Sequence, residues 1–546
     1  MGTPLGQLLG RAGAWLVDLT IGGRVVRVTT APGQISITAA TGTAVYVPGL
    51  APLSIPRTAG RLRSVALELT VTPPDFAELQ ARGQRLDFGS AIVRRWYGGQ
   101  TLEQATVAIS GRIGDVEYGD PMEPLSCTVF PDANDAGLVP SPSMRVDPAT
   151  WPVRSSPYTT DQNIAGVAYP IVIGQPGGVT VPGVTDTPAS PALLVETATP
   201  AVEYWSSRWL IAGHKVNAAT VTLYDISGNT SGTATVVTSA DALGLPVSYV
   251  QADSVSGYAV HAIAGHEYGV SWPTAGGALD DDGSALRGAN KVISWLLRKW
   301  TRPGFRFDVG RQAAQSGALD AYLLDFAITS PTDPVAWIRQ HLLPILPIEE
   351  VEGPDGLYFR AIRVAPRAAD VVGHIDCSPD GPVTRASRLA SRSTAVANRI
   401  TLDYAMGGPQ RRHLRRIIAD GTQAAPADPA LTDDRAVPLW LAEWSQTLFG
   451  VRDLEVSTAV ITDDSTAGAV LAWLLRRYAV PRRTLQVVGD VTLDRYSVGD
   501  VVTVTASDLY LTSVLAIVRE VEALDTAASL VLELDDDPTT IIRKVT

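Results

Sequence analysis

The segment around Cys377 holds the residue types of a nucleophilic site. His374 and Asp376 lie within three residues of this cysteine, and together they suggest a thiol hydrolase. In such enzymes the fold aims an imidazole at the thiolate, and the partners are usually distant in sequence. Here the segment continues directly into Ser378-Pro379-Asp380-Gly381, which is typical of a turn. We therefore interpret Cys377 as a structural residue.

An acidic run resembles half of a calcium-binding loop. Its sequence is Asp280-Asp281-Asp282-Gly283-Ser284. The EF-hand pattern needs spaced oxygen ligands and a closing glutamate, but Lys291 and Val292 stand where that glutamate is required. We interpret the run as an acidic loop before a helix, with Asp282 or Ser284 as the N-cap.

Glu349, Glu350 and Glu352 include the pair of carboxylates that glycoside cleavage requires. Adjacent residues of a strand point to opposite faces of the sheet, so neighbouring acids would not face one substrate. The following Gly353-Pro354-Asp355-Gly356 predicts a hairpin tip. We therefore expect these glutamates to be solvated on an exposed hairpin.

One dense basic run interrupts an otherwise acidic chain, and its residues are Arg411, Arg412, His413, Arg415 and Arg416. Such a run can contact DNA phosphates or an acidic neighbour. It lies beside a loop rich in proline, alanine and aspartate at 424–434. We favour a solvated rim or an inter-subunit contact.

The rest of the sequence contains no reactive constellation. No metal-ligand spacing connects the remaining histidines, which are His214, His261, His266 and His341. There is no P-loop, no GxSxG, and no GxGxxG that opens a helix after a strand. With only Cys127 and Cys377, one chain cannot supply four cysteine ligands, and we do not expect a disulfide between them. We assign no catalytic, cofactor-binding or metal-binding residue and expect no enzymatic activity.

The composition indicates a folded, multidomain and mainly β protein. The 546 residues are 45% hydrophobic and 18% charged, which fits three or four domains of roughly 100–200 residues. The 48 glycines and 38 prolines separate short Val- and Thr-rich runs, as in strands joined by frequent turns. A net charge of −12 disfavours non-specific nucleic-acid binding. With no bilayer-spanning apolar run and no recognisable signal peptide, we expect synthesis and folding in a reducing cytoplasm.

The first 140 residues are predicted to form a compact barrel or sandwich. Val65, Leu67, Leu69 and Val71 alternate with outward-facing residues, as in a half-buried strand. Further strands are predicted at 24–30, 106–113 and 125–130, with turns at 111–115 and 118–121.

A proline-rich linker at 131–157 and a buried strand at 168–174 lead into the middle of the chain. The low-charge stretch 175–274, with strands predicted at 193–196, 219–224, 233–238 and 247–251, is interpreted as a small inserted β domain with its own core. A mixed α/β unit then follows, with a helix at 290–300 and a strand at 358–364. Asp333 and Pro334 predict the start of another helix, as N-cap and first helical residue.

The last third is predicted to be β with one strong helix at 466–478. Strands are predicted at 398–404, 485–488, 491–493, 501–505, 514–521 and 530–534. No short-period repeat is present, which argues against a solenoid or propeller.

The order of these parts resembles the tail hub family of siphophages and gene-transfer particles, which is related to contractile-tail baseplate hubs and type VI secretion spike hubs. The resemblance rests on YPIVIG at 169–174, NRITL at 398–402, WLAEWSQ at 440–446, FGVR at 449–452 and YSVGDVVT at 496–503. It covers roughly 20–534, apart from the inserted segment.

The resemblance implies a homotrimeric structural protein of the virion, the hub of a tail tip or baseplate. In that family two similar β-barrel domains per chain form a six-fold-like ring that docks onto a hexameric tail tube. We therefore expect two β-barrel-like hub domains flanking an α/β unit, plus an inserted β domain. The expected parts are a barrel hub domain at 1–140, a linker and strand at 141–174, the inserted domain at 175–284, an α/β domain at 285–382, and a C-terminal β hub domain with one helix at 383–546.

The partners implied are the distal tail protein and tail tube, the tape measure protein, other tip proteins, and a tail fibre or spike. DNA would pass through the lumen without specific binding, and no stable membrane insertion is expected. Some relatives hold an iron–sulfur cluster or a fused lysozyme or peptidase. Neither is recognisable in this sequence. An iron site whose ligands come from several chains is left as an alternative.

Two other classes compete with the hub. One is a tail-associated cell-wall hydrolase. The other is a carbohydrate-binding receptor-recognition protein, in which Tyr204, Trp205 and Trp209 of the inserted domain would stack on sugar rings.

Overall fold

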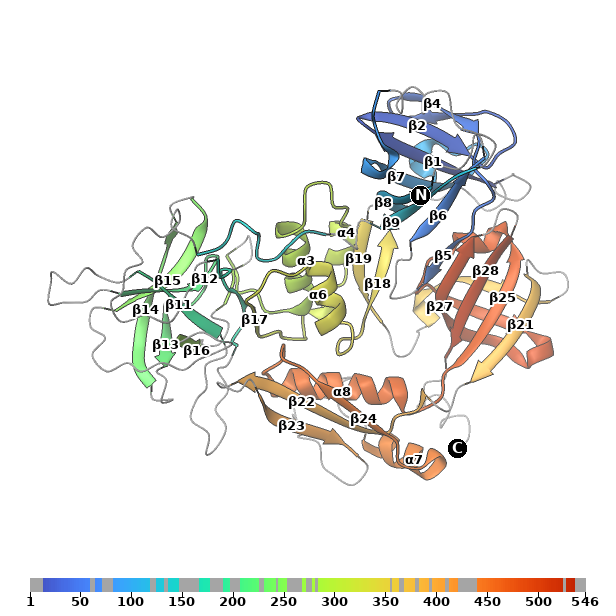
Figure 1. Cartoon of the computed structure of the whole chain (residues 1–546). Helices are drawn as coiled ribbons and strands as arrows, with labels where there is room; N and C mark the ends of the chain where they lie inside the picture. The colour runs from blue at the N-terminus through green and yellow to red at the C-terminus, as the bar shows by residue number, and fades with distance from the viewer. Residues whose placement is uncertain are drawn as a thin grey trace.

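The structure is a computed structural model that describes residues 13–58, 64–70, 82–117, 124–131, 136–146, 166–176, 190–196, 207–224, 230–241, 244–252, 268–271, 277–279, 283–353, 356–362, 368–378, 383–391, 395–407, 412–420, 439–523 and 527–535. The predicted mainly β, multidomain fold is confirmed. A small barrel lies at one end of the molecule, helices lie in the middle, and two larger sheets lie next to each other at the other end (Figure 1).

The N-terminal sheet has eight strands. Its strand order is β3-β4-β2-β1-β7-β8-β9-β6. The strands are β1 (Gly13–Ile21), β2 (Arg24–Thr29), β3 (Ile35–Ala39), β4 (Gly42–Pro48), β6 (Val65–Leu69), β7 (Ser90–Tyr97), β8 (Thr106–Glu117) and β9 (Leu125–Pro131). The chain after β4 bridges β2 and the edge strand β6: Leu50 N donates to Thr29 O (3.2 Å), and Ala51 N donates to Glu68 O (2.9 Å). The inward residues of β1, β6, β7 and β9 fill the core between them.

The turn predicted at 111–115 is wrong. β8 continues through these residues to Glu117, with a bulge between Gly114 and Glu117 where it pairs with β9. A Cβ at Gly111 would lie 1.9 Å from the carbonyl oxygen of Phe130. The glycines therefore allow close contact and a bulge between two strands, and do not reverse the chain.

The C-terminal sheet has the order β20-β26-β27-β28-β25-β21. Its strands are β20 (Val371–Asp376), β21 (Val383–Ser391), β25 (Arg483–Asp490), β26 (Val501–Ala506), β27 (Leu511–Ala523) and β28 (Ala527–Leu534). A strand from the N-terminal part of the chain, β5 (Ile55–Thr58), also pairs with β27. The strand predicted at 491–493 is wrong, because Val491–Arg495 is a 3₁₀ helix, η6, whose N-terminus is capped by Asp490.

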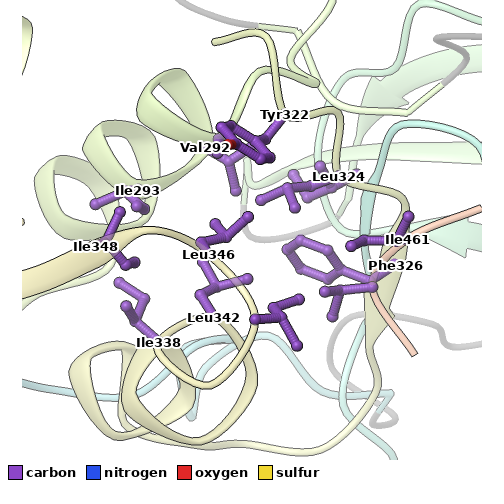
Figure 2. Packing of buried hydrophobic residues seen from close by; sticks show 14 of the residues in the cluster. Val292, Ile293, Tyr322, Leu324, Phe326, Ile338, Leu342, Leu346, Ile348 and Ile461 are labelled. Carbon is purple, nitrogen blue, oxygen red and sulfur yellow. The ribbon is translucent and has the colours of Figure 1, made fainter. Parts of the chain in front are cut away.

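The middle of the molecule combines helices with two small sheets. The helices are α3 (Ala289–Lys299), α4 (Val309–Ala313), α5 (Ser316–Leu319) and α6 (Pro334–His341). The sheets pair β10 (Ile171–Ile173) with β17 (Phe326–Ile328), and β18 (Ile348–Gly353) with β19 (Gly356–Ala361). Shorter 3₁₀ turns are η1 (Leu86–Phe88), η2 (Leu102–Gln104), η4 (Ala368–Asp370) and η7 (Ser507–Leu509). Figure 2 shows the apolar core, where Val292 and Ile293 of α3 face Leu342, Leu346 and Ile348.

The two helix starts predicted here have different outcomes. Asp333 caps α6 by accepting a hydrogen bond from Ala336 N (2.8 Å), as predicted. Ser284 does not cap α3, because that helix begins after Gly288. The carboxylate of Asp320 accepts from Lys291 N (3.1 Å), so a distant side chain serves this helix end. Asp282 lies outside the described residues.

A second α/β layer shares this core. It contains β22 (Arg399–Gly407), β23 (Arg412–Ala419), β24 (Asp453–Ser457), α7 (Leu439–Phe449) and α8 (Asp464–Tyr478). The strand order is β23-β22-β24, and α8 and the sheet pack into the same cluster as α3 and α6. The expected C-terminal part with one helix thus contains two. The expected boundary at 382 also separates β20 from β21, which belong to one sheet. We keep the division of the chain into five parts as a proposal, with two helices in the last part and with β20 assigned to the C-terminal sheet.

The inserted segment forms a closed barrel with the order β11-β12-β15-β14-β13-β16. Its strands are β11 (Ser190–Glu196), β12 (Ser207–Ala212), β13 (Thr220–Tyr224), β14 (Thr230–Ala240), β15 (Pro246–Ala252) and β16 (Tyr268–Ser271). The chain enters and leaves at one point, because Gly277 N donates to Gly174 O (2.8 Å). The small core is not separate, however: it includes Val172 of β10, while Leu210 and Val247 pack into the main core.

Candidate functional site

The residues around Cys377 do not form a nucleophilic site. His374 Nδ1 lies 2.8 Å from Thr503 Oγ1, and Asp376 accepts from Ser378 N (2.9 Å), as in the expected turn. Burial, assisted by the charge of Asp376, raises the pKa of the Cys377 thiol to about 11. A thiol with this pKa is protonated at neutral pH and is a poor nucleophile. Cys127 is buried in the N-terminal sheet, and both cysteines are free.

The expectation that Glu349 and Glu350 are solvated is wrong. Both are buried, and each is paired with arginine. Glu350 accepts from Arg339 Nε (2.7 Å) and Nη2 (2.6 Å). Glu349 accepts from Arg360 Nη2 (3.0 Å) and, through its other oxygen, from Arg519 Nη1 (2.9 Å). The two acids point to opposite faces, as expected, but both faces of this hairpin are covered by other elements.

The basic run on β23 pairs with acids of its own chain. Arg416 donates to both carboxylate oxygens of Asp403 (2.6 and 2.9 Å). Arg415 Nη1 donates to Asp464 (2.5 Å). The side chain of Arg416 is 62% exposed, so its ion pair with Asp403 is in contact with solvent. Arg411 lies outside the described residues.

The aromatic residues considered for sugar stacking are not a surface platform where the structure describes them. Trp209 is buried in the core of the inserted barrel, so its ring faces other side chains of the protein. Tyr204 and Trp205 lie outside the described residues. His214 is also buried, at the contact between this barrel and α3. His341 stacks near Trp337, with ring centroids 4.9 Å apart. His261 and His266 lie outside the described residues.

Within the part of the chain that the structure describes, no three potential metal-ligating side chains come together. No helix there is both long and apolar enough to cross a membrane.

The strongest polar constellation is a buried network that joins three parts of the fold. We call it the Arg519 cluster, and it comprises Arg519, Glu349, Glu533, Arg477 and Arg360. Arg519 of β27 donates to Glu349 of β18 and through Nε to Glu533 of β28 (3.0 Å). Arg477 of α8 donates to the other oxygen of Glu533. Arg360 of β19 donates to the carbonyl of Val498.

The electrostatics of the Arg519 cluster favour the charged forms of its members. Burial alone would raise the pKa of Glu533, but the charges of Arg519 and Arg477 hold it down to about 2. Burial likewise opposes the charge of Arg519, yet Glu533 and Glu349 raise its pKa above the usual value. The cluster therefore fixes the α/β unit against the C-terminal sheet through charges that each require the others.

A second constellation joins the two large sheets. β5 adds to β27 through the pairs from Ile55↔Ala523 to Thr58↔Glu520, and Ser54 Oγ donates to Glu522 (2.7 Å). Tyr97 of β7 donates from its hydroxyl to Asp494 of η6 (2.8 Å). Burial and the charge of Asp494 raise the pKa of Tyr97 well above its usual value. We call these contacts the inter-sheet junction. Two sheets that lie far apart in sequence thus form one unit.

We predict that Asp494→Asn weakens the inter-sheet junction. The buried guanidinium of Arg95 lies 4.0 Å from Asp494, so the substitution removes its nearby negative charge. We expect a loss of about 2 kcal/mol in the free energy of unfolding. Urea denaturation and calorimetry would each measure this loss of stability.

Asp87→Asn is the matched control for the junction, because Asp87 of η1, just before β7, pairs with an exposed Arg85. The control should behave like the unsubstituted chain. Equal effects of the two substitutions would show that the junction does not depend on Asp494.

An apolar face remains exposed on α7. Trp440 and Leu448 are 45% and 56% exposed, and Val451, just beyond the helix, is 55% exposed. Trp440 and Leu448 are eight residues apart, so they lie on one side of the helix. The opposite side, with Leu441 and Ala442, packs into the main core. The outer side thus combines three large apolar side chains with the polar Glu443 and Thr447, as in the surface of an element that contacts a partner.

The comparisons with known proteins are as follows. No protein-family model matches the sequence, and no curated protein matches it. Among solved structures the fold is similar to the prophage MuSo2 43 kDa tail protein from Shewanella oneidensis, at 10% identity and a TM-score of 0.36, covering 95% of this chain and 98% of that one. It is also similar to a chain of the virion of a native gene transfer agent particle, at 12% identity and a TM-score of 0.38, covering 68% and 85%. A third is a tail protein from Neisseria meningitidis MC58, at 12% identity and a TM-score of 0.34, covering 96% and 97%.

Proposed function

We propose that this chain is a structural protein of a bacteriophage virion, the hub of the tail tip or baseplate. It caps the tail tube and connects it to tail fibres or a spike during host attachment and DNA ejection. The observation that carries the proposal is the inter-sheet junction, in which β5 pairs with β27 and Tyr97 donates a hydrogen bond to Asp494. A hub that presents two barrels to a tube must hold them in one fixed relation, and this junction supplies that relation.

The proposed assembly is a homotrimer. Three chains with two barrel-like sheets each present six similar units, which match the subunits of a hexameric tube. The Arg519 cluster supports the same role, because it ties the α/β unit to one of these sheets. The net charge of −12 is compatible with DNA that passes the hub without being held.

The trimer is tested by reconstruction of the assembled tail tip. We expect three copies coaxial with the tube, with the N-terminal and C-terminal sheets alternating around the axis. One copy or six copies in the map would contradict the proposal. A monomer in solution would not, because ring contacts of this kind can require the tube as a template.

The two competing classes have less support. A glycoside hydrolase would need a free pair of carboxylates, whereas Glu349 and Glu350 are both tied to arginines. The carbohydrate-binding class relied partly on Trp209, which lies inside the barrel. We propose a role without enzymatic activity, in which the neighbours are the tail tube, tape measure, other tip proteins and fibres.

The exposed face of α7 gives a prediction on assembly. Leu448→Gln should leave the stability of the free chain nearly unchanged, because this side chain is already more than half exposed. In particles the same change should lower incorporation of the protein roughly tenfold, since a truncated apolar contact commonly costs more than 1 kcal/mol of binding. Quantitative mass spectrometry of purified particles would measure it.

Ser457→Gln is the matched control, because Ser457 is an exposed polar residue of the same α/β layer but lies on β24 and not on α7. This variant should be incorporated normally. Normal incorporation of both variants would remove α7 from the assembly surface.

A further inference from the structure

His214 lies at the point where the inserted barrel meets the rest of the protein. It follows β12, and it is 1% exposed. Its Nε2 accepts a hydrogen bond from Val172 N of β10 (2.9 Å). On the other side of the ring, Nδ1 lies 2.9 Å from Lys215 O. Because a carbonyl can only accept, Nδ1 carries the proton and Nε2 is the acceptor. The imidazole is therefore neutral in this arrangement.

Further contacts place His214 between the inserted barrel, β10 and α3. Its own carbonyl accepts from Ser248 Oγ of β15 (2.8 Å). Its ring meets Trp295 of α3 edge to face, with centroids 5.8 Å apart. The neighbouring Gly213 N donates to Pro170 O (2.8 Å). His214 thus contacts the barrel through its backbone, and β10 and α3 through its side chain.

The charged groups around His214 oppose a positive imidazole. Lys299 of α3 lies over the ring of Trp295, with 5.0 Å between Nζ and the centroid. Lys215 contributes its backbone carbonyl. The carboxylate of Asp241, after β14, accepts from Tyr169 OH (3.0 Å) and Leu245 N (2.9 Å). Among the described residues, no carboxylate is hydrogen-bonded to the ring, whose two nitrogens face Val172 N and Lys215 O.

We propose that His214 is an acid-sensitive latch that fastens the inserted barrel to β10 and α3 when neutral and releases this contact when protonated. Protonation places a proton on Nε2, so that two N–H groups face each other where Val172 N now donates. The buried hydrogen bond is lost, and a positive charge is created beside Lys299. The barrel then remains folded around Trp209 and Ile211 but separates more often from the main core.

The sign of the pH dependence follows from linkage. Burial lowers the pKa of docked His214 to about 4; the hydrogen bond with Lys215 O acts against this shift, and the charge of Lys299 adds to it. A released, solvated histidine titrates near its ordinary value of about 6.5. The docking stability is therefore complete above about pH 6.5 and is lost as the pH falls toward about 4. Between about pH 7 and pH 5 the open fraction should rise roughly 20-fold.

Hydrogen–deuterium exchange of the full chain tests the latch, with labelling times scaled for the intrinsic effect of pH. We expect segments 170–174 and 209–217 to exchange faster at about pH 5 than at about pH 7. His214→Gln keeps one acceptor and one donor on the side chain but does not titrate, so its exchange should not respond to acid. His374→Gln, at an exposed position of β20, is the matched control and should respond like the unsubstituted chain.

Lys299→Met provides a second variant should His214→Gln fail to fold. Removal of this charge raises the pKa of docked His214, so the acid response should become smaller than that of the unsubstituted chain. An unsubstituted chain with no acid response in these segments overturns the proposal. An acid response of the same size in His214→Gln or in Lys299→Met also overturns it.

Discussion

Arg519→Met is expected to lower the free energy of unfolding by about 3 kcal/mol. Arg519 is 14% exposed and pairs with both Glu349 and Glu533. Methionine fills a similar volume but leaves two buried carboxylates with one arginine each, and breaking a buried ion pair on one side is costly. Urea denaturation followed by tryptophan fluorescence would measure the change. The α/β unit and the C-terminal sheet should then unfold in separate steps, because the cluster connects them.

The pH dependence gives a second readout for the same variant. With a folded-state pKa of about 2, Glu533 contributes stability that is complete above about pH 4.5 and is lost as the pH falls toward 2. In Arg519→Met the pKa of Glu533 should rise, so this acid-dependent contribution should shrink. The double variant Arg519→Met/Glu533→Gln should recover part of the loss, because neither of its substituted side chains carries a charge.

Arg416→Met is the control for Arg519→Met, because Arg416 makes an equally well-oriented pair with Asp403 on an exposed sheet face. Its effect should be a small fraction of that of Arg519→Met. If both substitutions lower the free energy of unfolding by the same amount, burial does not explain the contribution of the Arg519 cluster to stability.

Asp325→Ala should have an effect of about 3–5 kcal/mol. The Asp325 side chain is fully buried, and its carboxylate accepts from Arg287 Nε (2.7 Å) and Nη2 (2.8 Å), from Gln175 N (2.7 Å) and from Thr462 Oγ1 (2.6 Å). Alanine removes the carboxylate that pairs with the half-buried guanidinium of Arg287 and leaves only the charge of Asp463 to act on it. It also removes the acceptor of two further donors. We expect the loss to be visible in the urea midpoint of the main core.

The same substitution should act on the connection to the inserted barrel. Gln175 lies where the chain enters the inserted segment, and Gly174 packs directly against Asp325. Exchange at residues 171–175 should therefore increase together with the global destabilisation. Asp325→Asn should be milder, because an amide oxygen still accepts from Gln175 N or Thr462.

Asp453→Ala is the matched control for Asp325→Ala, because its bidentate pair with Arg399 is exposed. It should leave residues 171–175 unchanged. A comparable increase in exchange there would show that Asp325 does not hold this connection.

Several elements could be predicted from sequence because their causes are local. The alternation of Val65, Leu67 and Leu69 indicates a strand, and β6 is that strand. Asp333 and Pro334 predict a helix start, and α6 begins there. Where a local signal had two meanings, the prediction was wrong. Gly111 and Gly114 suggest a turn, but they also suit two strands in close contact, and only the position of Phe130 distinguishes the two.

Elements whose signals repeat at short spacing follow from local sequence: strands with alternating residues, helices with an apolar side, and N-caps three residues before the backbone N–H that donates to them. Which elements meet depends on the whole fold. Glu349 and Arg519 are 170 residues apart, and Ser54 and Glu522 are 468 apart. The sequence does not distinguish a buried charged side chain from an exposed one, because burial depends on the elements that cover the side chain. That is why Glu349 was expected in solvent, and why the inter-sheet junction and the place of His214 could not be predicted.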